Sequence, residues 1–357
     1  MLGVMGRGEG ECAAATPCAP PPPQLSPASG EGAHPPLSPR GRGGCSARPR
    51  LGGAIPPRRE NCCLGREGLV RKTTIWWQTL RPRTLPAAVG PVVLGQALVA
   101  AGHFSWATAV LCVVCAVALQ LAVNIANDLF DGLSGVDQPD RVGPIRALQA
   151  GLLNAAELRA GLVVTLGIAI ATGLWLIVFG HWLLWILGGL AVLAVLGYSG
   201  GRRPYANRAL GEVAVWLFFG PVAVLGSLLA QRSPVTPEAV VAAVLVGLPV
   251  AAILVVNNLR DRHTDARAGK ATLAVRLGPE RTRLLFAALT LGPLLAALPL
   301  ALPLWTWAAW TIVALAAVHM NLRLRSRDGR KLNPLLGYSA LYSLGFSLWL
   351  ILRLVLA

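Results

Sequence analysis

Nine long apolar segments separated by short loops dominate the sequence after residue 73. Apolar residues make up 54% of the 357 residues and charged residues only 13%, whereas soluble domains carry about 25% charged residues. A helix needs roughly 20 apolar residues to cross a bilayer, and only helices or closed barrels can cross it. Because the segments are long and show no alternation, they predict an all-α integral membrane protein with nine transmembrane helices. The predicted spans are 84–101, 105–126, 160–179, 181–198, 212–230, 237–256, 282–301, 304–321 and 335–355.

The loops between these spans alternate in charge. Loops after the odd-numbered spans carry one arginine, Arg232, whereas loops after the even-numbered spans are rich in Arg and Lys. Basic loops stay in the cytoplasm, which predicts a cytoplasmic N-terminus and cytoplasmic long loops. The basic residues are Arg141 and Arg146; Arg202, Arg203 and Arg208; Arg260, Arg262, Arg267, Lys270 and Arg276; and Arg323, Arg325, Arg327, Arg330 and Lys331.

Residues 1–72 are rich in Pro, Gly and Arg and have no continuous apolar run. Such a segment cannot bury a core, so we expect a disordered tail and no secretory signal, followed by a membrane domain over 73–357. Two interpretations of the tail stay open: a flexible extension, or sequence upstream of the true start. The chain carries a net charge of +16, but the tail lacks interleaved aromatic residues, which argues against nucleic-acid binding.

Two of the seven cysteines, Cys112 and Cys115, lie in the second predicted span. Neither a His nor a second Cys pair lies nearby in the sequence. We therefore expect them to behave as small apolar residues rather than as a metal or redox site.

The acidic residues of the membrane domain gather in two segments that follow predicted spans. Residues 124–141 form the first motif and residues 257–270 the second, and together they hold six of the 11 acids after residue 72. Residues three or four apart share a helix face, so the side chains within each motif can point together. The side chains that can share a face are Asn124, Asp128 and Asp131 in the first motif and Asn257, Asp261 and Asp265 in the second.

Carboxylate and amide oxygens in this arrangement are the ligands that Mg²⁺ prefers, together with water and phosphate oxygens. Two such clusters predict Mg²⁺ held around one diphosphate, with basic side chains neutralising the charge of the leaving pyrophosphate. The alternative is a set of ordinary solvated loop carboxylates. Two matched motifs at span ends disfavour it. The basic residues placed for this role are Arg141, Arg146, Arg260 and Lys270.

The two motifs also resemble each other. Asn127-Asp128-Leu-Phe-Asp131 aligns with Asn257-Asn258-Leu-Arg-Asp261, and four spans separate them. This repeat predicts two related four-helix halves plus one helix, with both motifs at the cytoplasmic mouth of one cavity.

Two further basic stretches have two interpretations each. Arg202 lies one turn beyond Tyr198 and is either a topology anchor or a diphosphate clamp. Arg81 and Arg83, which open the first predicted span, are either a basic flank or ligands of an anionic substrate.

Taken together, these stretches resemble the UbiA superfamily of intramembrane prenyltransferases over about residues 74–356. Within it they look like the MenA-type 1,4-dihydroxy-2-naphthoate polyprenyltransferases of the menaquinone pathway. The first motif usually carries a third Asp four residues after Asp131; here Gly135 stands there and the acid comes at Asp137, as in the MenA-type pattern. Whether Asp137 binds metal directly or through water stays open. The matching stretches are Arg81–Pro86, Asn127–Asp137, Asp140–Arg146, Arg203–Tyr205 with Leu210–Glu212, and Asn257–Asp261 through Gly269–Gly278.

The resemblance implies a nine-helix UbiA-like bundle in the plasma membrane and a Mg²⁺ cofactor. The implied reaction moves a polyprenyl group from polyprenyl diphosphate to 1,4-dihydroxy-2-naphthoate, with loss of CO₂ and pyrophosphate, giving demethylmenaquinol. The implied metal ligands are Asn127, Asp128, Asp131, Asp137, Asp261 and Asp265, of which Asp128, Asp131, Asp261 and Asp265 are the catalytic set. The implied substrate-binding residues are Asn124, Arg141, Arg146, Tyr198, Arg202, Asn257 and Lys270 for the diphosphate end, and Arg81 or Arg83 for the acceptor carboxylate.

Two alternatives remain at this stage. The first keeps the superfamily but changes the acceptor to 4-hydroxybenzoate, homogentisate, haem B or a sugar-phosphate lipid precursor. The second is a membrane transporter, which also uses repeats, but its acids would be expected nearer the bilayer midplane.

Overall fold

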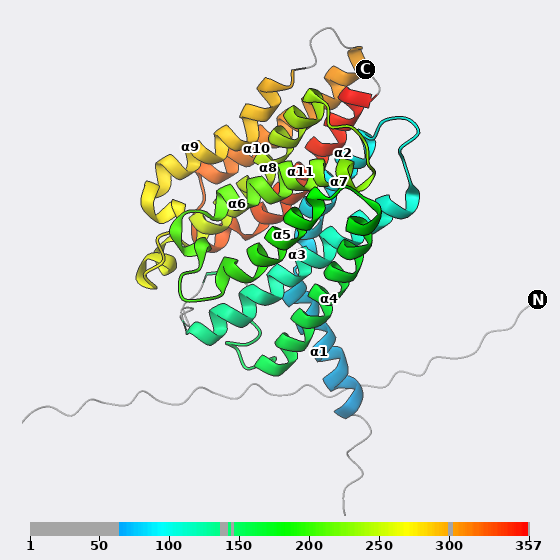
Figure 1. Ribbon diagram of the computed structural model, residues 1–357. Helices are drawn as coiled ribbons and strands as arrows, with labels where there is room; N and C mark the ends of the chain where they lie inside the picture. Colours follow the sequence, from blue (N-terminus) through cyan, green and yellow to red (C-terminus); the bar gives the residue numbers. More distant parts are fainter. Residues whose placement is uncertain (1–63, 136–141, 144–145, 299–302, 356–357) are drawn as a thin grey trace, which may run out of the picture. The chain divides into compact units, whose positions relative to one another are not determined.

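The computed structural model describes residues 64–135, 142–143, 146–298 and 303–355, all within one unit, Arg59–Ala357 (Figure 1). In these ranges the chain consists of helices joined by short loops, with no β-strand. The prediction of an all-α protein is therefore confirmed. Residues Asp137, Asp140 and Arg141 of the first motif lie outside the described ranges.

Each of the nine predicted apolar segments overlaps a helix in the described part of the chain. The segment predicted over 212–230 is α6, η3 and α7 in succession, because a π-helical turn containing Pro221 interrupts the regular helix. The elements are α1 (Leu64–Leu80), η1 (Pro82–Thr84), α2 (Leu85–Ala97), α3 (Trp106–Ser134), α4 (Ala155–Phe179), α5 (Leu183–Ser199), η2 (Tyr205–Arg208), α6 (Gly211–Leu217), η3 (Phe218–Val222), α7 (Ala223–Ala230), α8 (Pro237–Arg267), α9 (Leu273–Ala296), α10 (Leu304–Arg325), η4 (Gly329–Leu332) and α11 (Asn333–Val355).

The outer faces of the long helices are apolar. Among the described residues, five helical segments are long and apolar enough to cross a membrane: α3, α4, Gly211–Ala230, α8 and Gly329–Val355; α5 is apolar but shorter. Large apolar side chains such as Val163, Leu193, Ile312 and Leu315 point outward and are more than half exposed. Water would not tolerate so much exposed apolar surface on a monomer, whereas lipid matches it.

Helix α1 begins at Leu64, so part of the segment that we assigned to the tail, residues 64–72, is helical. No proline lies between Pro57 and Pro82 to interrupt a helix there. The end of α1 packs onto α3 and α4 through Trp76, whose ring lies against Gly161. The Lys72 Nζ atom also lies 2.7 Å from a carboxylate oxygen of Glu157 at the start of α4.

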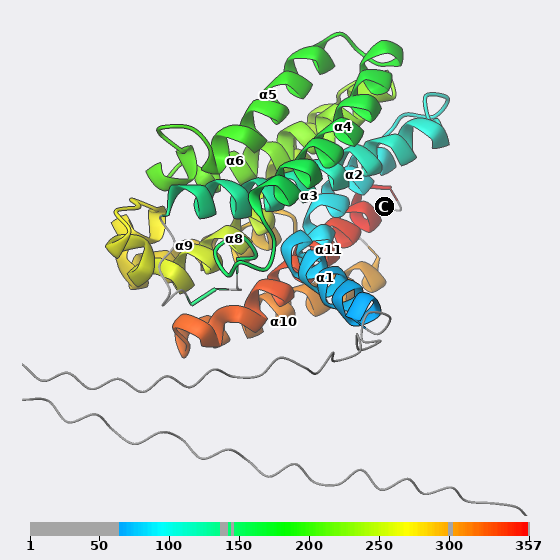
Figure 2. The same cartoon turned by 90° about the horizontal axis from the view of Figure 1, so that it is seen from below.

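Two long helices, α3 and α8, position the motifs. Both continue past the ends of their apolar runs, so the first and second motifs lie largely on helices rather than in loops. A glycine in the left-handed conformation follows each of them closely: Gly135 at φ 64° and Gly269 at φ 73°. Helix α3 packs mainly against α4, and α8 mainly against α9, and both views show these helices side by side (Figures 1 and 2).

Small residues let α6 and η3 approach α8 closely. A Cβ atom built on Gly220 would lie 2.5 Å from the Ala243 carbonyl oxygen, and one on Gly247 would lie 2.6 Å from the Trp216 carbonyl oxygen. Close backbone contact of this kind is typical of helix packing in membranes.

We expect Gly247→Val to lower the thermal unfolding temperature in detergent markedly, because its Cβ would collide with backbone rather than with a flexible side chain. Overpacking costs typically 1–3 kcal/mol. The control is Gly345→Ala in α11, where a Cβ meets nothing within 4 Å. Equal unfolding temperatures for both variants would contradict the close contact.

Candidate active site

A cavity of about 970 Å³ lies inside the bundle and is lined by residues from α1 to α8 and from α11. Its lining changes along α3: Cys112 lies in an apolar part with Val92 and Leu184, and Asp131 lies in a polar part. These two α3 positions are roughly 28 Å apart at the rise of an α-helix. The cavity is therefore amphiphilic and matches a ligand with a charged head and an apolar tail. The sequence-predicted residues that line it are Arg81, Arg83, Asn124, Asn127, Asp131, Arg146, Tyr198, Asn257, Arg260, Asp261, Asp265 and Lys270.

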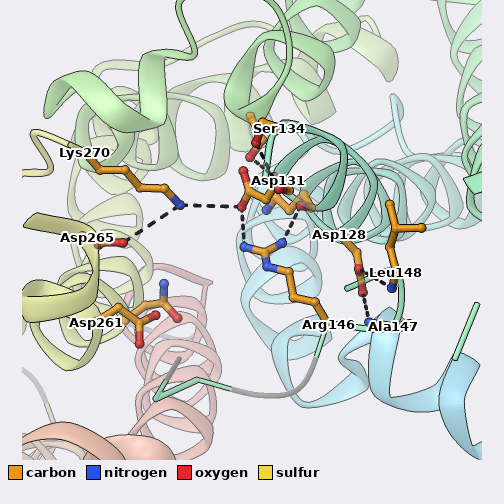
Figure 3. A network of polar contacts seen from close by, with 12 residues as sticks. Asp128, Asp131, Ser134, Arg146, Ala147, Leu148, Asp261, Asp265 and Lys270 are labelled. Carbon is orange, nitrogen blue, oxygen red and sulfur yellow. Dashed lines mark hydrogen bonds and ion pairs between the residues drawn. The ribbon is translucent and has the colours of Figure 1, made fainter. Parts of the chain in front are cut away.

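One ammonium group joins the two motifs. The Lys270 Nζ atom lies 3.9 Å from Asp131 Oδ2 and 4.0 Å from Asp265 Oδ1, as the dashed lines in Figure 3 show. Asp131 comes from α3 and Asp265 from α8, so side chains far apart in the sequence share one cation. The two motifs thus lie at the same end of the cavity.

The two aspartates of the first motif have different partners. The Asp131 carboxylate forms a buried ion pair with Arg146, whose guanidinium also donates to the main-chain carbonyl of Asn127. The Asp128 carboxylate instead accepts hydrogen bonds from the main-chain N–H groups of Ala147, at 3.0 Å, and Leu148, at 3.2 Å (Figure 3). Asp128 thereby fixes the turn that presents Arg146, and it is not among the residues that line the cavity.

The second motif has a similar pair. The buried Arg260 guanidinium donates to both carboxylate oxygens of Asp261, at 2.8 and 2.6 Å. It also donates to the amide oxygens of Asn257, at 2.7 Å, and Asn333, at 3.1 Å. Each motif therefore contains an Asp neutralised by a buried arginine, and Asn333 ties the second motif to α11.

The asparagines of the first motif contact neighbouring elements. Asn124 donates to the main-chain carbonyl of Leu80 at 2.9 Å, just before η1. Asn127 accepts a hydrogen bond from the Ser199 hydroxyl at 2.7 Å, at the end of α5. Both side chains line the cavity, so the first motif also organises the chain around its polar end.

Two tyrosines cover the polar end near α5. Tyr198 and Tyr205 pack edge to face with ring centroids 5.4 Å apart, and the Tyr205 hydroxyl donates to the Ala194 carbonyl at 2.8 Å. Burial raises the pKa of Tyr205 to about 12, and the rings of both tyrosines line the cavity.

Some residues fall differently from the sequence analysis. Arg202 is exposed and is not among the cavity-lining residues, while Asp137 and Arg141 lie outside the described ranges. Conversely, Thr84, Gln120 and Asn333 line the cavity and were missed. Gln120 could have been noticed, because it lies four residues before Asn124 on the same helix face; Asn333 carried no local signal.

The oxygen ligands around Lys270 fit a hard divalent cation. Asp131, Asp261 and Asp265 line one end of the cavity with amide oxygens beside them, the donor set that suits Mg²⁺. In the described part of the chain no three His, Cys, Asp or Glu side chains already converge on one metal position. Instead, Lys or Arg neutralises each carboxylate, and holding Mg²⁺ would require the carboxylates to exchange these cations for metal.

Fold and site together define a helical membrane protein with a cavity for an amphiphilic anion. The model of the UbiA prenyltransferase family matches residues 88–351. The chain therefore belongs to the UbiA prenyltransferase family. This membership argues against the transporter alternative.

Curated relatives carry one activity in their names. The chain is 35% identical to the 1,4-dihydroxy-2-naphthoate octaprenyltransferase of Escherichia coli K12, covering 76% of this chain and 91% of the relative. It is 41% identical to the protein of the same name from Mycobacterium tuberculosis H37Rv, covering 76% and 94% respectively.

Solved structures share the fold at low sequence identity. A UbiA homolog from Archaeoglobus fulgidus bound to DMAPP and Mg²⁺ is 19% identical, with a TM-score of 0.53 over 76% of this chain and 97% of that one. The apo structure of a UbiA homolog from Aeropyrum pernix K1 is 18% identical, with a TM-score of 0.55 over 77% and 96%.

We expect Arg260→Met to lower the thermal unfolding temperature strongly, because it leaves the buried Asp261 carboxylate without its guanidinium. Breaking a buried pair costs about 3–5 kcal/mol. The control is Arg283→Met, since the partners of Arg283, Glu280 and Asp328, are largely exposed and such pairs contribute little. Similar losses in both variants would argue against a buried pair at Arg260.

Proposed function

We propose that this protein transfers a polyprenyl group from polyprenyl diphosphate to 1,4-dihydroxy-2-naphthoate, with loss of CO₂ and pyrophosphate, giving demethylmenaquinol. The observation that carries the proposal is the shared cation: Lys270 lies within 4.0 Å of carboxylates from both motifs, at the polar end of an amphiphilic cavity. The naphthoate acceptor follows the names of the relatives at 35% and 41% identity.

The polar end would hold the diphosphate and Mg²⁺. When bound, Mg²⁺ neutralises the charge that develops on the leaving pyrophosphate. Arg146 and Lys270 have a second use there, because each can pass from its carboxylate to a phosphate oxygen when the carboxylate takes up metal. The proposed metal ligands are Asn127, Asp131, Asp137, Asp261 and Asp265; the proposed phosphate ligands are Asn124, Arg141, Arg146, Tyr198, Asn257 and Lys270. Asp128 and Arg202 do not line the cavity, so we propose neither of them as a ligand.

The apolar part of the cavity suits the polyprenyl chain. Its lining includes Val92, Leu176, Leu184 and Leu187, which offer no hydrogen bonds to water. Excluding water protects an allylic cation, or a transition state close to one, from capture by hydroxide or water. The naphthoate ring can then react as the nucleophile.

Arg81 is the better of the two candidates for the acceptor carboxylate. Both Arg81 and Arg83 line the cavity, but Arg81 is partly buried whereas Arg83 is exposed. A guanidinium with reduced solvent contact binds a carboxylate more strongly than an exposed one.

Nine helices would cross the plasma membrane, with the N-terminus and the polar end of the cavity on the cytoplasmic side. The Arg- and Lys-rich loops support this orientation. Two related halves are supported by the placement of one motif on α3 and the other on α8, and by the matching packing of α3 on α4 and of α8 on α9.

We expect membranes containing the protein to convert 1,4-dihydroxy-2-naphthoate and a polyprenyl diphosphate into a prenylated, decarboxylated naphthoquinol, with release of pyrophosphate. Mass analysis of the lipid extract checks the product, and chelating Mg²⁺ should abolish it. Prenylation of 4-hydroxybenzoate or homogentisate, with none of the naphthoate, would overturn the proposed acceptor.

We expect Asp131→Asn and Asp261→Asn each to lower kcat by about 100-fold or more, the scale for losing one group that stabilises transition-state charge. Both variants should still insert into the membrane, because an amide keeps the shape and some hydrogen bonds of the carboxylate. The control is Asp328→Asn, whose carboxylate is largely exposed and is not among the groups that line the cavity. Near-normal activity of either motif variant would rule out its assigned role.

A further inference from the structure

The turn before α2 holds Arg81 in an unusual backbone conformation. Arg81 has φ 51° and ψ 58°, the left-handed region that side chains other than glycine rarely adopt. Among the described residues only three non-glycine residues have positive φ, and Arg81 is the one that lines the cavity. Strain of this kind persists where surrounding contacts impose it, and it gathers at functional sites.

Hydrogen bonds donated by Thr84, Gln120 and Asn124 fix this turn. The Thr84 main-chain N–H and its hydroxyl both donate to the Arg81 carbonyl, each at 2.9 Å. The Thr84 hydroxyl oxygen then accepts from Gln120 at 3.1 Å, and Asn124 donates to the Leu80 carbonyl at 2.9 Å. Gln120 and Asn124 are both buried.

Ending α1 does not require all of these contacts. Pro82 and the two bonds from Thr84 already close the turn locally. The contacts from Gln120 and Asn124 do something further, because both residues belong to α3, the helix that carries Asp128 and Asp131. They therefore fix the Arg81 turn relative to the diphosphate end of the cavity.

We propose that Thr84 and Gln120 are positioning residues for acceptor recognition: with Asn124 they hold Arg81 in its left-handed turn, which places the guanidinium at the cavity wall to bind a carboxylate on the aromatic acceptor. The proposal rests on the proposed prenyl transfer. Its chemical basis is geometric: forming a carbon–carbon bond requires the aromatic carbon and the allylic carbon to meet in a narrow range of orientations. The Arg81 guanidinium supplies that constraint, because its turn is hydrogen-bonded to α3.

The first test separates the guanidinium from the turn. In Arg81→Gly the left-handed conformation becomes easier, since glycine adopts it without strain. The same substitution removes the guanidinium that is proposed to bind the acceptor carboxylate. We expect an unfolding temperature equal to or above that of the wild type, a KM for 1,4-dihydroxy-2-naphthoate raised by about 10-fold or more, and an unchanged KM for polyprenyl diphosphate. A purely structural Arg81 predicts unchanged kinetics instead.

The second test addresses the positioning residues. Thr84→Val keeps the shape of the side chain but removes the hydroxyl that donates to Arg81 and accepts from Gln120, whereas Thr84→Ser keeps that hydroxyl and is the matched control. We expect Thr84→Val to raise the KM for the naphthoate by about five-fold, the equivalent of one neutral hydrogen bond, and Thr84→Ser to behave like the wild type. Gln120→Met removes the amide that donates to Thr84 and leaves the Thr84 hydroxyl in place; it is the second variant should Thr84→Val fail to fold.

A substrate comparison identifies the carboxylate as the group recognised. 1,4-Dihydroxynaphthalene has the same ring and hydroxyls without the carboxylate, so the KM for this analogue should not change in Arg81→Gly or Thr84→Val. An equal rise for both acceptors, or a rise in the KM for polyprenyl diphosphate alone, would overturn the proposal.

Activity of the wild-type protein separates a failure of the proposed function from a failure of the positioning role. If it forms no product from the naphthoate and a polyprenyl diphosphate, the proposed function fails. If it forms product and Thr84→Val and Gln120→Met keep the wild-type KM for the naphthoate, only the positioning role fails.

Discussion

The structure depends on pairing carboxylates with cations at one end of an apolar bundle. Burying an unpaired carboxylate beside membrane-embedded helices is costly, and here Asp131 pairs with Arg146 and Lys270, and Asp261 with Arg260. Because Lys270 also approaches Asp265, the pairing draws together the ends of α3 and α8, which are distant in the sequence. The surrounding connections follow from these pairs: Asp128 holds the backbone of the turn that presents Arg146, and Asn333 attaches α11 to Arg260.

The same pairs suit the end of the cavity to an anionic head group with metal. Arginine and lysine side chains that neutralise carboxylates can instead neutralise phosphates, and the released carboxylates can take up divalent cations. Such an exchange keeps every charge compensated, so it avoids the penalty of exposing a buried ion without a partner. The remaining lining is apolar, which strengthens these interactions by lowering the local dielectric. The apolar part of the cavity also accommodates an apolar tail and excludes water.

Hydropathy and residue spacing were sufficient to predict the helices and the faces on which the motif residues lie. They were not sufficient to predict the tertiary contacts that complete the site. Apolar run lengths located the helices from α2 to α11, and the three- and four-residue spacing placed Asp131, Asp261 and Asp265 on the cavity wall. The apolar runs end before the helices do: the predicted span 237–256 stops short of the end of α8, which continues to Arg267 through residues that are polar yet compatible with a helix. The spacing also grouped Asp128 with Asp131, whereas the Asp128 carboxylate binds the backbone of Ala147 and Leu148. That contact, like the one between Arg260 and Asn333, joins segments whose approach depends on tertiary packing, and no local pattern encodes it.

Helix α3 can hold the proposed acceptor site and the proposed diphosphate site at a fixed distance from each other. It carries Gln120 and Asn124, which contact the turn at Arg81, and Asp131, which lies beside Lys270. Asn124 and Asp131 are seven residues apart, so the rise of an α-helix separates them by roughly 10 Å. A regular, fully hydrogen-bonded helix bends little over two turns, and its neighbours α2 and α4 pack along it. The proposed acceptor anchor at Arg81 and the proposed diphosphate site at Asp131 contact this helix at two points, so α3 holds them at a nearly constant separation. A constant separation is the physical condition for an aromatic carbon and an allylic carbon to meet repeatedly in the same geometry.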